Sequence, residues 1–296
     1  MSAPRTLGPD QAGWPAGLAH LERPPESLWI LGAELPGVPA VAVVGSRRAT
    51  FAGLDIARSI GCELAGAGVQ VISGMARGID AAAHRGALEA GGSTVAVLGC
   101  GIDICYPQQH LQLRDDIAAH GCVVSEEPPG TPPWKQNFPK RNRLIAALAC
   151  AVVVVEATPR SGALSTARWA ADLGREVLAV PGSIRSPQSA GTNLLVRDGA
   201  RPFLGMNDLF EAVGELGNLA GSGAVGAGAA SSSVRWRSLA PPLQEILRRM
   251  GPDPVHPDAV GSALGLPAAV VAARLGTLEL AGAVMSLPGG LVARNY

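Results

Sequence analysis

The chain has few aromatic residues, no surplus of charge of either sign and no long apolar run. Of its 296 residues, 4% are aromatic and 16% are charged, and 24 basic residues balance 24 acidic ones. Without net charge, bulk attraction to nucleic acid or to an anionic membrane is excluded, so any anion site must be local. No apolar stretch reaches the roughly 18 residues of a membrane span, and the N-terminus lacks a signal peptide. We expect a cytoplasmic protein without a membrane partner.

Signatures of metal and cofactor binding are also missing. The five cysteines form no Cys-x-x-Cys pair, and no histidine pair supplies zinc-finger spacing. The turn Gly45-Ser46-Arg47 lacks the full GxGxxG spacing of dinucleotide sites, and no GxxxxGK[ST] sequence occurs. These absences predict no metal, no NAD and no ATP hydrolysis by the Walker route, so we expect no cofactor.

What the chain does contain is a regular alternation of strand-like and helix-like segments after residue 38. Short apolar runs such as 41–44, 69–72 and 151–155 end in small residues and are followed by helical stretches. Continuous apolar runs are typical of parallel strands buried on both faces. The alternation predicts an α/β fold with a doubly wound, extended Rossmann-like, mostly parallel sheet.

Composition changes divide the chain into four predicted parts. Residues 1–38 are predicted to be an irregular arm or short helix lying on the main domain, and residues 39–213 the Rossmann-like domain. Residues 214–236, dominated by Gly, Ala and Ser, are predicted to be a flexible linker. Residues 237–296 show three short helical patterns and two extended pieces, the outline of a small winged-helix domain. Because basic residues are few there, its partner is open between DNA and protein.

One segment, residues 135–143, concentrates cations in an otherwise balanced chain. It holds four basic residues, no acid and the aromatic Phe138, and it leads into an apolar helix. In isolation such a run is more typical of a solvated helix start with snorkelling arginines. Beside other anion sites it indicates a surface that holds a polyanion and stacks a flat ring. Its candidate residues are Lys135, Phe138, Lys140, Arg141, Asn142 and Arg143.

Several predicted strands end in loops of small residues that carry arginine. Backbone N–H groups of such loops and the helix N-termini behind them can cradle phosphate, and guanidinium groups match its oxygens. A single glycine-rich turn would also serve tight helix–sheet packing, but several at one sheet edge favour anion binding. The candidate phosphate-binding residues are Gly45, Ser46, Arg47, Arg48, Ser73, Gly74, Arg77, Ser161 and Gly162.

These motifs together resemble the DNA-processing protein A family (DprA, also called Smf) of bacterial natural transformation. They occur in family order over about residues 25 to 205, and they are Val43-Val44-Gly45-Ser46-Arg47, Ile72-Ser73-Gly74-Met75-Ala76-Arg77-Gly78-Ile79-Asp80, Val97-Leu98-Gly99-Cys100-Gly101-Ile102-Asp103 with Tyr106-Pro107, Phe138-Pro139-Lys140-Arg141-Asn142-Arg143, Ser161-Gly162-Ala163-Leu164-Ser165-Thr166, Val180-Pro181-Gly182 and Gly191-Thr192-Asn193. The resemblance implies a homodimer that binds single-stranded DNA, protects the incoming strand and loads the RecA recombinase, without being an enzyme.

The resemblance also assigns roles to residues. It implies phosphate contacts for Arg47 and Lys135 and a stacked or wedged base for Phe138. Lys140, Arg141 and Arg143 fit backbone contacts, although Arg141-Asn142 could equally brace the pocket from inside. Many members carry a helical domain ahead of the Rossmann unit, and residues 1–38 are too short for one. The dimer surface, the RecA contact and the length of strand covered stay open at this point.

The alternative is an enzyme of related fold. The fold resembles that of the cytokinin-activating phosphoribohydrolases, which use a glutamate in a Pro-Gly-Gly-x-Gly-Thr-x-x-Glu motif. Here the corresponding residues 160–169 contain no glutamate, and Glu156 is the one carboxylate nearby. An arginine in place of the acid would repel an oxocarbenium-like transition state. We therefore expect no catalytic residue, and we expect Asp80 and His84 to fix the Ser73-Gly74 loop by hydrogen bonds.

Overall fold

The computed structural model describes residues 3–33, 35, 37–214, 216, 239–251, 254–280, 283–287 and 289–294. The chain divides into two compact units, residues 1–225 and 226–296, which are described separately. Of the predicted linker, only positions 214 and 216 lie within the described residues.

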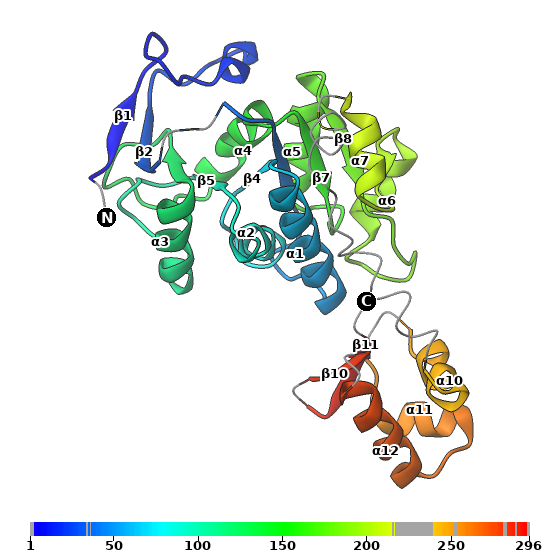
Figure 1. Ribbon diagram of the computed structural model, residues 1–296. Coiled ribbons are helices and arrows are strands. Elements are labelled where there is room, and N and C mark those ends of the chain that lie inside the picture. Colours follow the sequence, from blue (N-terminus) through cyan, green and yellow to red (C-terminus); the bar gives the residue numbers. More distant parts are fainter. Residues whose placement is uncertain are drawn as a thin grey trace. The chain divides into compact units, whose positions relative to one another are not determined.

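The first unit is built on a nine-stranded sheet with the order β1-β2-β6-β5-β4-β3-β7-β8-β9 (Figure 1). All neighbours from β6 to β9 are parallel, and the pairs β1–β2 and β2–β6 are antiparallel. The predicted doubly wound, mostly parallel sheet is thereby confirmed. The strands are β1 (Arg5–Leu7), β2 (Leu28–Gly32), β3 (Ala40–Val44), β4 (Gln70–Ser73), β5 (Thr94–Leu98), β6 (Cys122–Ser125), β7 (Ala151–Val154), β8 (Glu176–Ala179) and β9 (Arg201–Pro202).

The N-terminal segment is more ordered than an irregular arm. Two stretches of residues 1–38 are strands of the main sheet, and Ile30 of β2 pairs with Val124 of β6. Leu28 and Ile30 are fully buried. The predicted short helix is present at Ala16–His20. The two strands were not predicted, because they are short and flanked by proline and glycine, so their periodicity is weak. In the fold, β2 covers the edge of β6 that would otherwise expose unpaired backbone groups.

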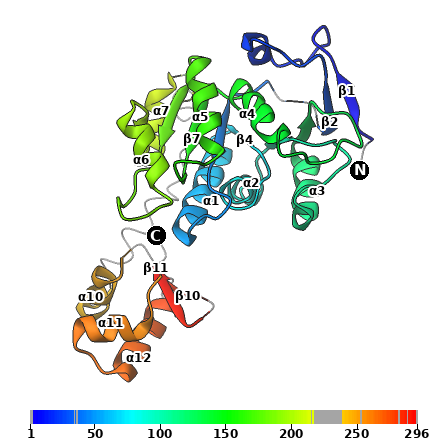
Figure 2. The same ribbon diagram turned by 180° about the vertical axis from the view of Figure 1, so that it is seen from behind.

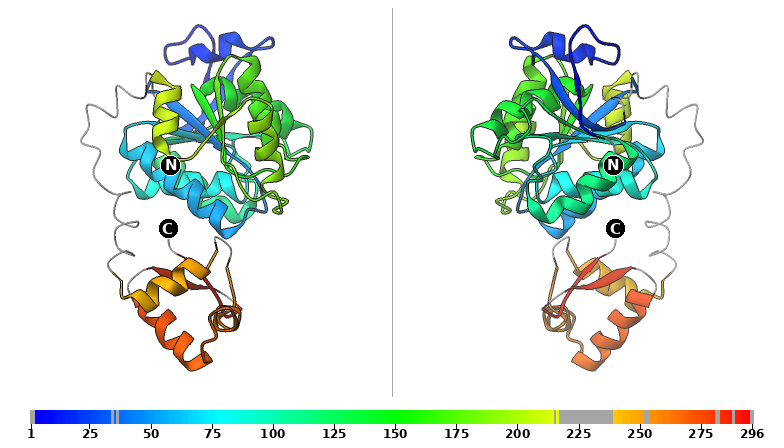
Figure 3. Two further views of the ribbon diagram at one scale, coloured as in Figure 1. Left: turned by 90° about the vertical axis from the view of Figure 1, so that its right-hand side faces the viewer. Right: turned by 90° about the vertical axis from the view of Figure 1, so that its left-hand side faces the viewer.

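Helices cover both faces of the sheet (Figure 3). Side chains alternate along β3, so Val41 and Val43 join the core with one helical layer, and Ala42 and Val44 join the core with the other. This two-sided burial is why the strands are continuous apolar runs. One layer contains α1 (Phe51–Gly66), α2 (Ile79–Glu89), α3 (Leu111–His120) and α7 (Met206–Ala212); the other contains the 3-10 helix η1 (Ala16–His20), α4 (Asn137–Leu148), α5 (Ala163–Asp172) and α6 (Ala190–Arg197).

The winding of the chain reverses beside β3 (Figures 1 and 2). The chain passes from β3 through β4 and β5 to β6 on one side, then returns to β7 on the other side of β3. The loops that follow β3 and β7 therefore diverge in opposite directions from two adjacent carboxyl ends. Ligands of doubly wound proteins bind in the crevice that such a reversal opens.

The second unit consists of three helices followed by a hairpin, as predicted for a winged helix. The helices are α10 (Pro241–Arg249), α11 (Pro257–Leu264) and α12 (Ala268–Leu280), and the strands are β10 (Val284–Leu287) and β11 (Leu291–Arg294). Ile246, Val271 and Leu278 are buried in its core. Among the described residues no single helix is long and apolar enough to cross a membrane; α11 with Ala268–Glu279 passes that test only as a pair bent by 115°.

Candidate nucleic-acid interface

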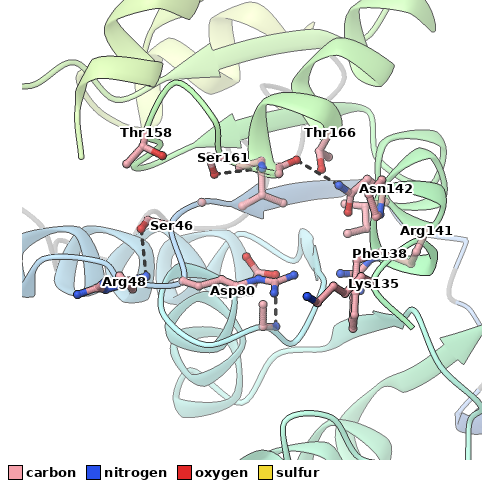
Figure 4. Close-up of a pocket in the computed structure, with 18 of the residues that line it drawn as sticks. Ser46, Arg48, Asp80, Lys135, Phe138, Arg141, Asn142, Thr158, Ser161 and Thr166 are labelled. Carbon is pink, nitrogen blue, oxygen red and sulfur yellow. Dashed lines mark hydrogen bonds between the residues drawn. The ribbon is translucent and has the colours of Figure 1, made fainter. Parts of the chain in front are cut away.

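A cavity of about 860 Å³ lies where the winding reverses, at the carboxyl ends of β3 and β7. Most of its lining comes from the loop after β3, the loop after β7, and the start of α4 with the residues ahead of it (Figure 4). Ala76, Asp80, Tyr106 and Gln188 complete the lining. The predicted site residues among its lining are Gly45, Ser46, Arg47, Arg48, Lys135, Phe138, Arg141, Asn142, Ser161 and Gly162. The structure thus brings together most of the residues that the sequence analysis selected.

The predicted site residues after β4 do not line the cavity. The Ser73 hydroxyl donates to the carbonyl of Val43 at 2.6 Å. The Gly74 N–H donates to Asp80 Oδ2 at 3.2 Å, which confirms that Asp80 fixes this loop. Arg77 is exposed outside the cavity lining. The Ser73 hydroxyl and the Gly74 N–H are therefore occupied by internal hydrogen bonds.

His84 differs from the expectation made for it. Its Nδ1 atom lies 2.7 Å from the hydroxyl of Thr94, which itself donates to the carbonyl of Val71. The ring is fully buried, and burial lowers the pKa of His84 to about 3, with smaller contributions from His110 and Arg141. His84 therefore stabilises the pairing region of β4 and β5, away from the Ser73-Gly74 loop.

Two of the cations in segment 135–143 are held in ion pairs. Lys140 Nζ lies 3.3 Å from Glu126 and 3.1 Å from Glu127, and Arg143 donates to Glu126 at 2.5 Å. Neither cation lines the cavity. Segment 135–143 contains no acidic residue. The two acids that pair with its cations, Glu126 and Glu127, directly follow β6. Because the charges of Lys140 and Arg143 are already paired with carboxylates, these residues do not have the free charges that the expected DNA-backbone contacts need.

Arg141 lines the cavity with a buried side chain and braces it from inside. Its side chain is 6% exposed, and its guanidinium donates to the carbonyls of Gly74 at 3.0 Å and of Val97. Burial lowers the pKa of Arg141 to about 10, although Asp80 opposes that effect. Burial likewise raises the pKa of Asp80, against the field of Arg141. Arg141 thereby links the ends of β4 and β5 to α4, which is the internal role left open by the sequence.

The cations at the cavity rim have different surroundings. Arg47, Arg48 and Lys135 are exposed, and in the described part of the chain none of them forms an ion pair. Their charges are therefore exposed at the cavity and outside any ion pair of the described residues, although Arg47 interacts electrostatically with Asp80, a buried carboxyl of the same lining. Such groups are available to an anionic ligand.

An aromatic cluster borders these cations. The Arg47 guanidinium carbon lies over the Phe138 ring, 5.2 Å from its centroid. The Tyr106 ring lies 5.5 Å from Phe138, inclined by 39°. Tyr106 lines the cavity and is 42% exposed. Tyr106 belongs to one of the predicted motifs but had no predicted role, because nothing in the linear pattern places the loop after β5 beside the start of α4.

The cavity lining also offers uncharged hydrogen-bonding groups. Asn142 donates to the carbonyl of Gly162 at 3.1 Å, so α4 supports the loop that precedes α5. The Ser161 hydroxyl accepts from the Ala163 N–H at 3.3 Å, and the Ser46 hydroxyl accepts from the Arg48 N–H at 3.1 Å. Sequence reasoning missed further polar residues of the lining, namely Thr158, Thr166 and Gln188.

Gly45 serves packing in this structure. A Cβ atom at Gly45 would lie 2.7 Å from the Ile79 side chain and 2.8 Å from the carbonyl of Glu156. The missing side chain thus lets α2 approach the ends of β3 and β7. Close packing was one of the two uses left open for such turns.

The carboxylate of Glu156 is engaged away from the cavity. Its two oxygens accept hydrogen bonds from the Thr50 N–H at 2.9 Å and the Thr50 hydroxyl at 2.5 Å, at the start of α1. Glu156 does not line the cavity. The enzymatic alternative depended on this carboxylate, and its geometry offers that alternative no support. Among the described residues, no three His, Cys, Asp or Glu side chains gather as metal ligands would.

Comparisons with known proteins agree with this fold. The family model for DNA recombination-mediator protein A matches residues 5–214, and the model for the DprA winged helix domain matches residues 233–290. A DprA-type protein of Mycobacterium tuberculosis is 45% identical over 293 residues, which cover 94% of this chain and 74% of that protein.

Two solved structures are also similar. DNA processing protein A of Streptococcus pneumoniae has a TM-score of 0.66 and 37% identity, covering 70% of this chain and 73% of that one. The Helicobacter pylori protein, whose structure concerns its binding of single-stranded DNA, has a TM-score of 0.64 and 28% identity, covering 72% and 96%. This chain therefore belongs to the DNA recombination-mediator protein A family, which includes the DNA processing proteins DprA and Smf.

Proposed function

We propose that this protein binds single-stranded DNA at the cavity between the ends of β3 and β7, as a mediator of recombination that is not an enzyme. The observation that carries the proposal is the cavity rim. There the unpaired cations Arg47 and Lys135 stand beside the rings of Phe138 and Tyr106. A strand of DNA presents the two matching features, a row of phosphates and unpaired flat bases.

The rim favours single strands over duplex DNA for a geometric reason. Aromatic side chains stack on a base only when the face of that base is exposed, and in a duplex the faces are covered by neighbouring pairs. The cations supply a contact that does not depend on sequence, because every nucleotide carries the same phosphate. Binding should therefore tolerate any base sequence. The single-stranded DNA binding of the Helicobacter pylori relative supports this choice of ligand.

Membership of the family supports the remaining parts of the proposal. The protein protects incoming single strands during DNA uptake and loads a RecA-type recombinase onto them, and it acts as a homodimer in the cytoplasm. Sedimentation at several concentrations tests the dimer. The lag of RecA filament assembly on a strand precoated with single-strand-binding protein tests the loading, because a loader shortens that lag.

The decisive experiment compares single-stranded with duplex oligonucleotides of one sequence by fluorescence anisotropy. We expect tighter binding of the single strand and a steep loss of affinity between about 50 and 200 mM salt, because each phosphate contact releases counterions. Incubation with nucleoside monophosphates, followed by chromatography, tests for release of free base. Equal affinity for both DNA forms, or base release, would overturn the proposal.

A further inference from the structure

We infer that the indole ring of Trp134 is a second stacking platform for single-stranded DNA, placed just outside the cavity, and that it receives the base next to the nucleotides held inside. This inference rests on the proposed function and deepens it, because it extends the bound strand beyond the cavity. No role was predicted for Trp134, which directly precedes the cationic segment 135–143.

Trp134 is a large apolar side chain that the fold leaves in contact with solvent. It is 53% exposed, more than any other tryptophan among the described residues. In that part of the chain its ring takes part in no aromatic pair and no cation–π contact, and it does not pack against the cores of the first unit. A single exposed apolar side chain is ordinary on a protein surface, so exposure alone assigns it no role. Its position beside the cavity does.

The residues on either side of Trp134 line the cavity. Pro133 and Lys135 belong to the lining, whereas Trp134 does not. Consecutive Cα atoms lie about 3.8 Å apart, so the indole is attached one backbone step from a lysine of the rim. A strand whose phosphate contacts Lys135 therefore passes within reach of the Trp134 ring as it leaves the cavity.

The order of side chains around Lys135 matches the order of groups in a DNA strand. Phe138 follows this lysine and lines the cavity, and Trp134 precedes it and lies outside the lining. A single strand likewise carries one phosphate between two successive bases. The segment thus offers a ring inside the cavity, a cation at the rim and a ring outside, which fits two bases and the phosphate that joins them.

Hydrogen bonds hold the backbone of Trp134 in place before a ligand arrives. Its N–H donates to the carbonyl of Pro132 at 2.8 Å, and its carbonyl accepts from the Asn137 N–H at 3.0 Å. Pro132 and Pro133 restrict the chain ahead of it, because the pyrrolidine ring fixes φ. The platform therefore loses less conformational freedom on binding than a side chain on a mobile loop would lose.

Oligothymidines of increasing length, and abasic strands of the same lengths, test this assignment with the full chain. Trp134→Leu should match the wild type on short oligothymidines, which end within the cavity. Once the strand reaches Trp134, the variant should bind about fivefold or more weakly, and it should bind abasic strands of every length as the wild type does. Trp134→Phe should recover most of the loss, since it keeps a ring. The matched control is Val38→Ala, because Val38 is 46% exposed but precedes β3 at the opposite end of the strand.

Tryptophan emission gives a second readout, which does not depend on affinity. A base stacked on an indole quenches its fluorescence, so oligothymidine should lower the emission of the wild-type chain, which has five tryptophans. Trp134→Phe should still bind oligothymidine but lose most of this quenching. Trp169→Phe is the control and should leave the quenching in place, because Trp169 packs against the buried core. This readout also decides the question if Trp134→Leu lowers the thermal midpoint.

The outcomes separate the inference from the function on which it rests. If the wild-type chain binds no oligothymidine of any length, the proposed function is wrong. If the wild type binds, and either Trp134→Leu matches it at every length or Trp134→Phe keeps the full quenching, the assignment of Trp134 is overturned while the proposed function stands. Equal losses on oligothymidine and on abasic strands would also overturn the assignment, because a stacking platform needs a base.

Discussion

The two ends of segment 135–143 carry the same kind of charge in opposite surroundings. Lys135 is exposed at the cavity rim without an ion pair in the described structure, whereas Lys140 contacts Glu126 and Glu127. Further along, Arg141 is buried and bonded to backbone carbonyls. The comparison teaches that a cluster of cations predicts a binding surface only for those members that the fold leaves unpaired.

The physical difference lies in what a ligand must displace. A phosphate that approaches Lys135 replaces water and loosely held ions. At Lys140 it would have to compete with two carboxylates, which raise the pKa of Lys140 although burial alone would lower it. Surface ion pairs are weak in stability terms but still neutralise the local field. The rim half of the segment should therefore act in binding and the helical half in folding.

Arg141→Met removes the buried cation of segment 135–143, and we expect the largest effect from it. Removing the guanidinium leaves the Asp80 carboxyl buried without its cation and two carbonyls without a donor. We expect the free energy of unfolding to fall by about 3–5 kcal/mol, measured by urea denaturation. Adding Asp80→Asn to the variant should recover part of this loss. A change below about 1 kcal/mol would show that Arg141 is no brace.

The dependence of stability on pH tests His84, a buried residue whose pKa is also lowered in part by Arg141. The pKa of His84 is lowered to about 3 because the ring is buried, so the folded protein does not bind the proton that the unfolded chain accepts near its ordinary value. The contribution of the uncharged His84 ring to the free energy of unfolding is complete above about pH 6.5. It is lost as the pH falls toward 3, at about 1.4 kcal/mol per pH unit. His84→Gln should flatten that slope in urea unfolding. The exposed His120→Gln is the control and should leave the slope in place.

Lys135→Ala tests the rim end of the segment. Loss of one charge-assisted phosphate contact should weaken single-stranded DNA binding about tenfold. Anisotropy titration measures this, and the thermal midpoint should not change because the side chain is exposed. Wild-type affinity in this variant would remove Lys135 from the site.

Lys140→Ala makes the same charge change five positions further along, and we expect the smallest effect. Stability should change by less than about 1 kcal/mol, as is usual for exposed ion pairs. DNA affinity should stay within about twofold of wild type, since Glu126 and Glu127 already neutralise this lysine. A loss of DNA affinity equal to that of Lys135→Ala would show that the ion pairs of Lys140 do not keep it out of DNA binding.

Much of the fold followed from local patterns. The runs 41–44, 69–72 and 151–155 contain most of β3, β4 and β7, because short, β-branched apolar runs suit a sheet that is buried on both faces. The strands of residues 1–38 escaped prediction, since pairing with β6 and not their own periodicity stabilises them. Among the site residues, the loops after β3 and β7 were located correctly because carboxyl ends of parallel strands share one edge.

The amino-acid sequence by itself determined the buried parallel strands, the C-terminal helices with their hairpin, and the cationic segment, because the pattern of each is local in the chain. Only the tertiary structure decided which cations remain unpaired. Glu126 and Glu127 reach Lys140 and Arg143 from another strand end, and Asp80 faces Arg141 from another helix. It also decided that Tyr106 stands beside Phe138. Electrostatic and aromatic contacts act through space, so their partners cannot be deduced from spacing along the chain.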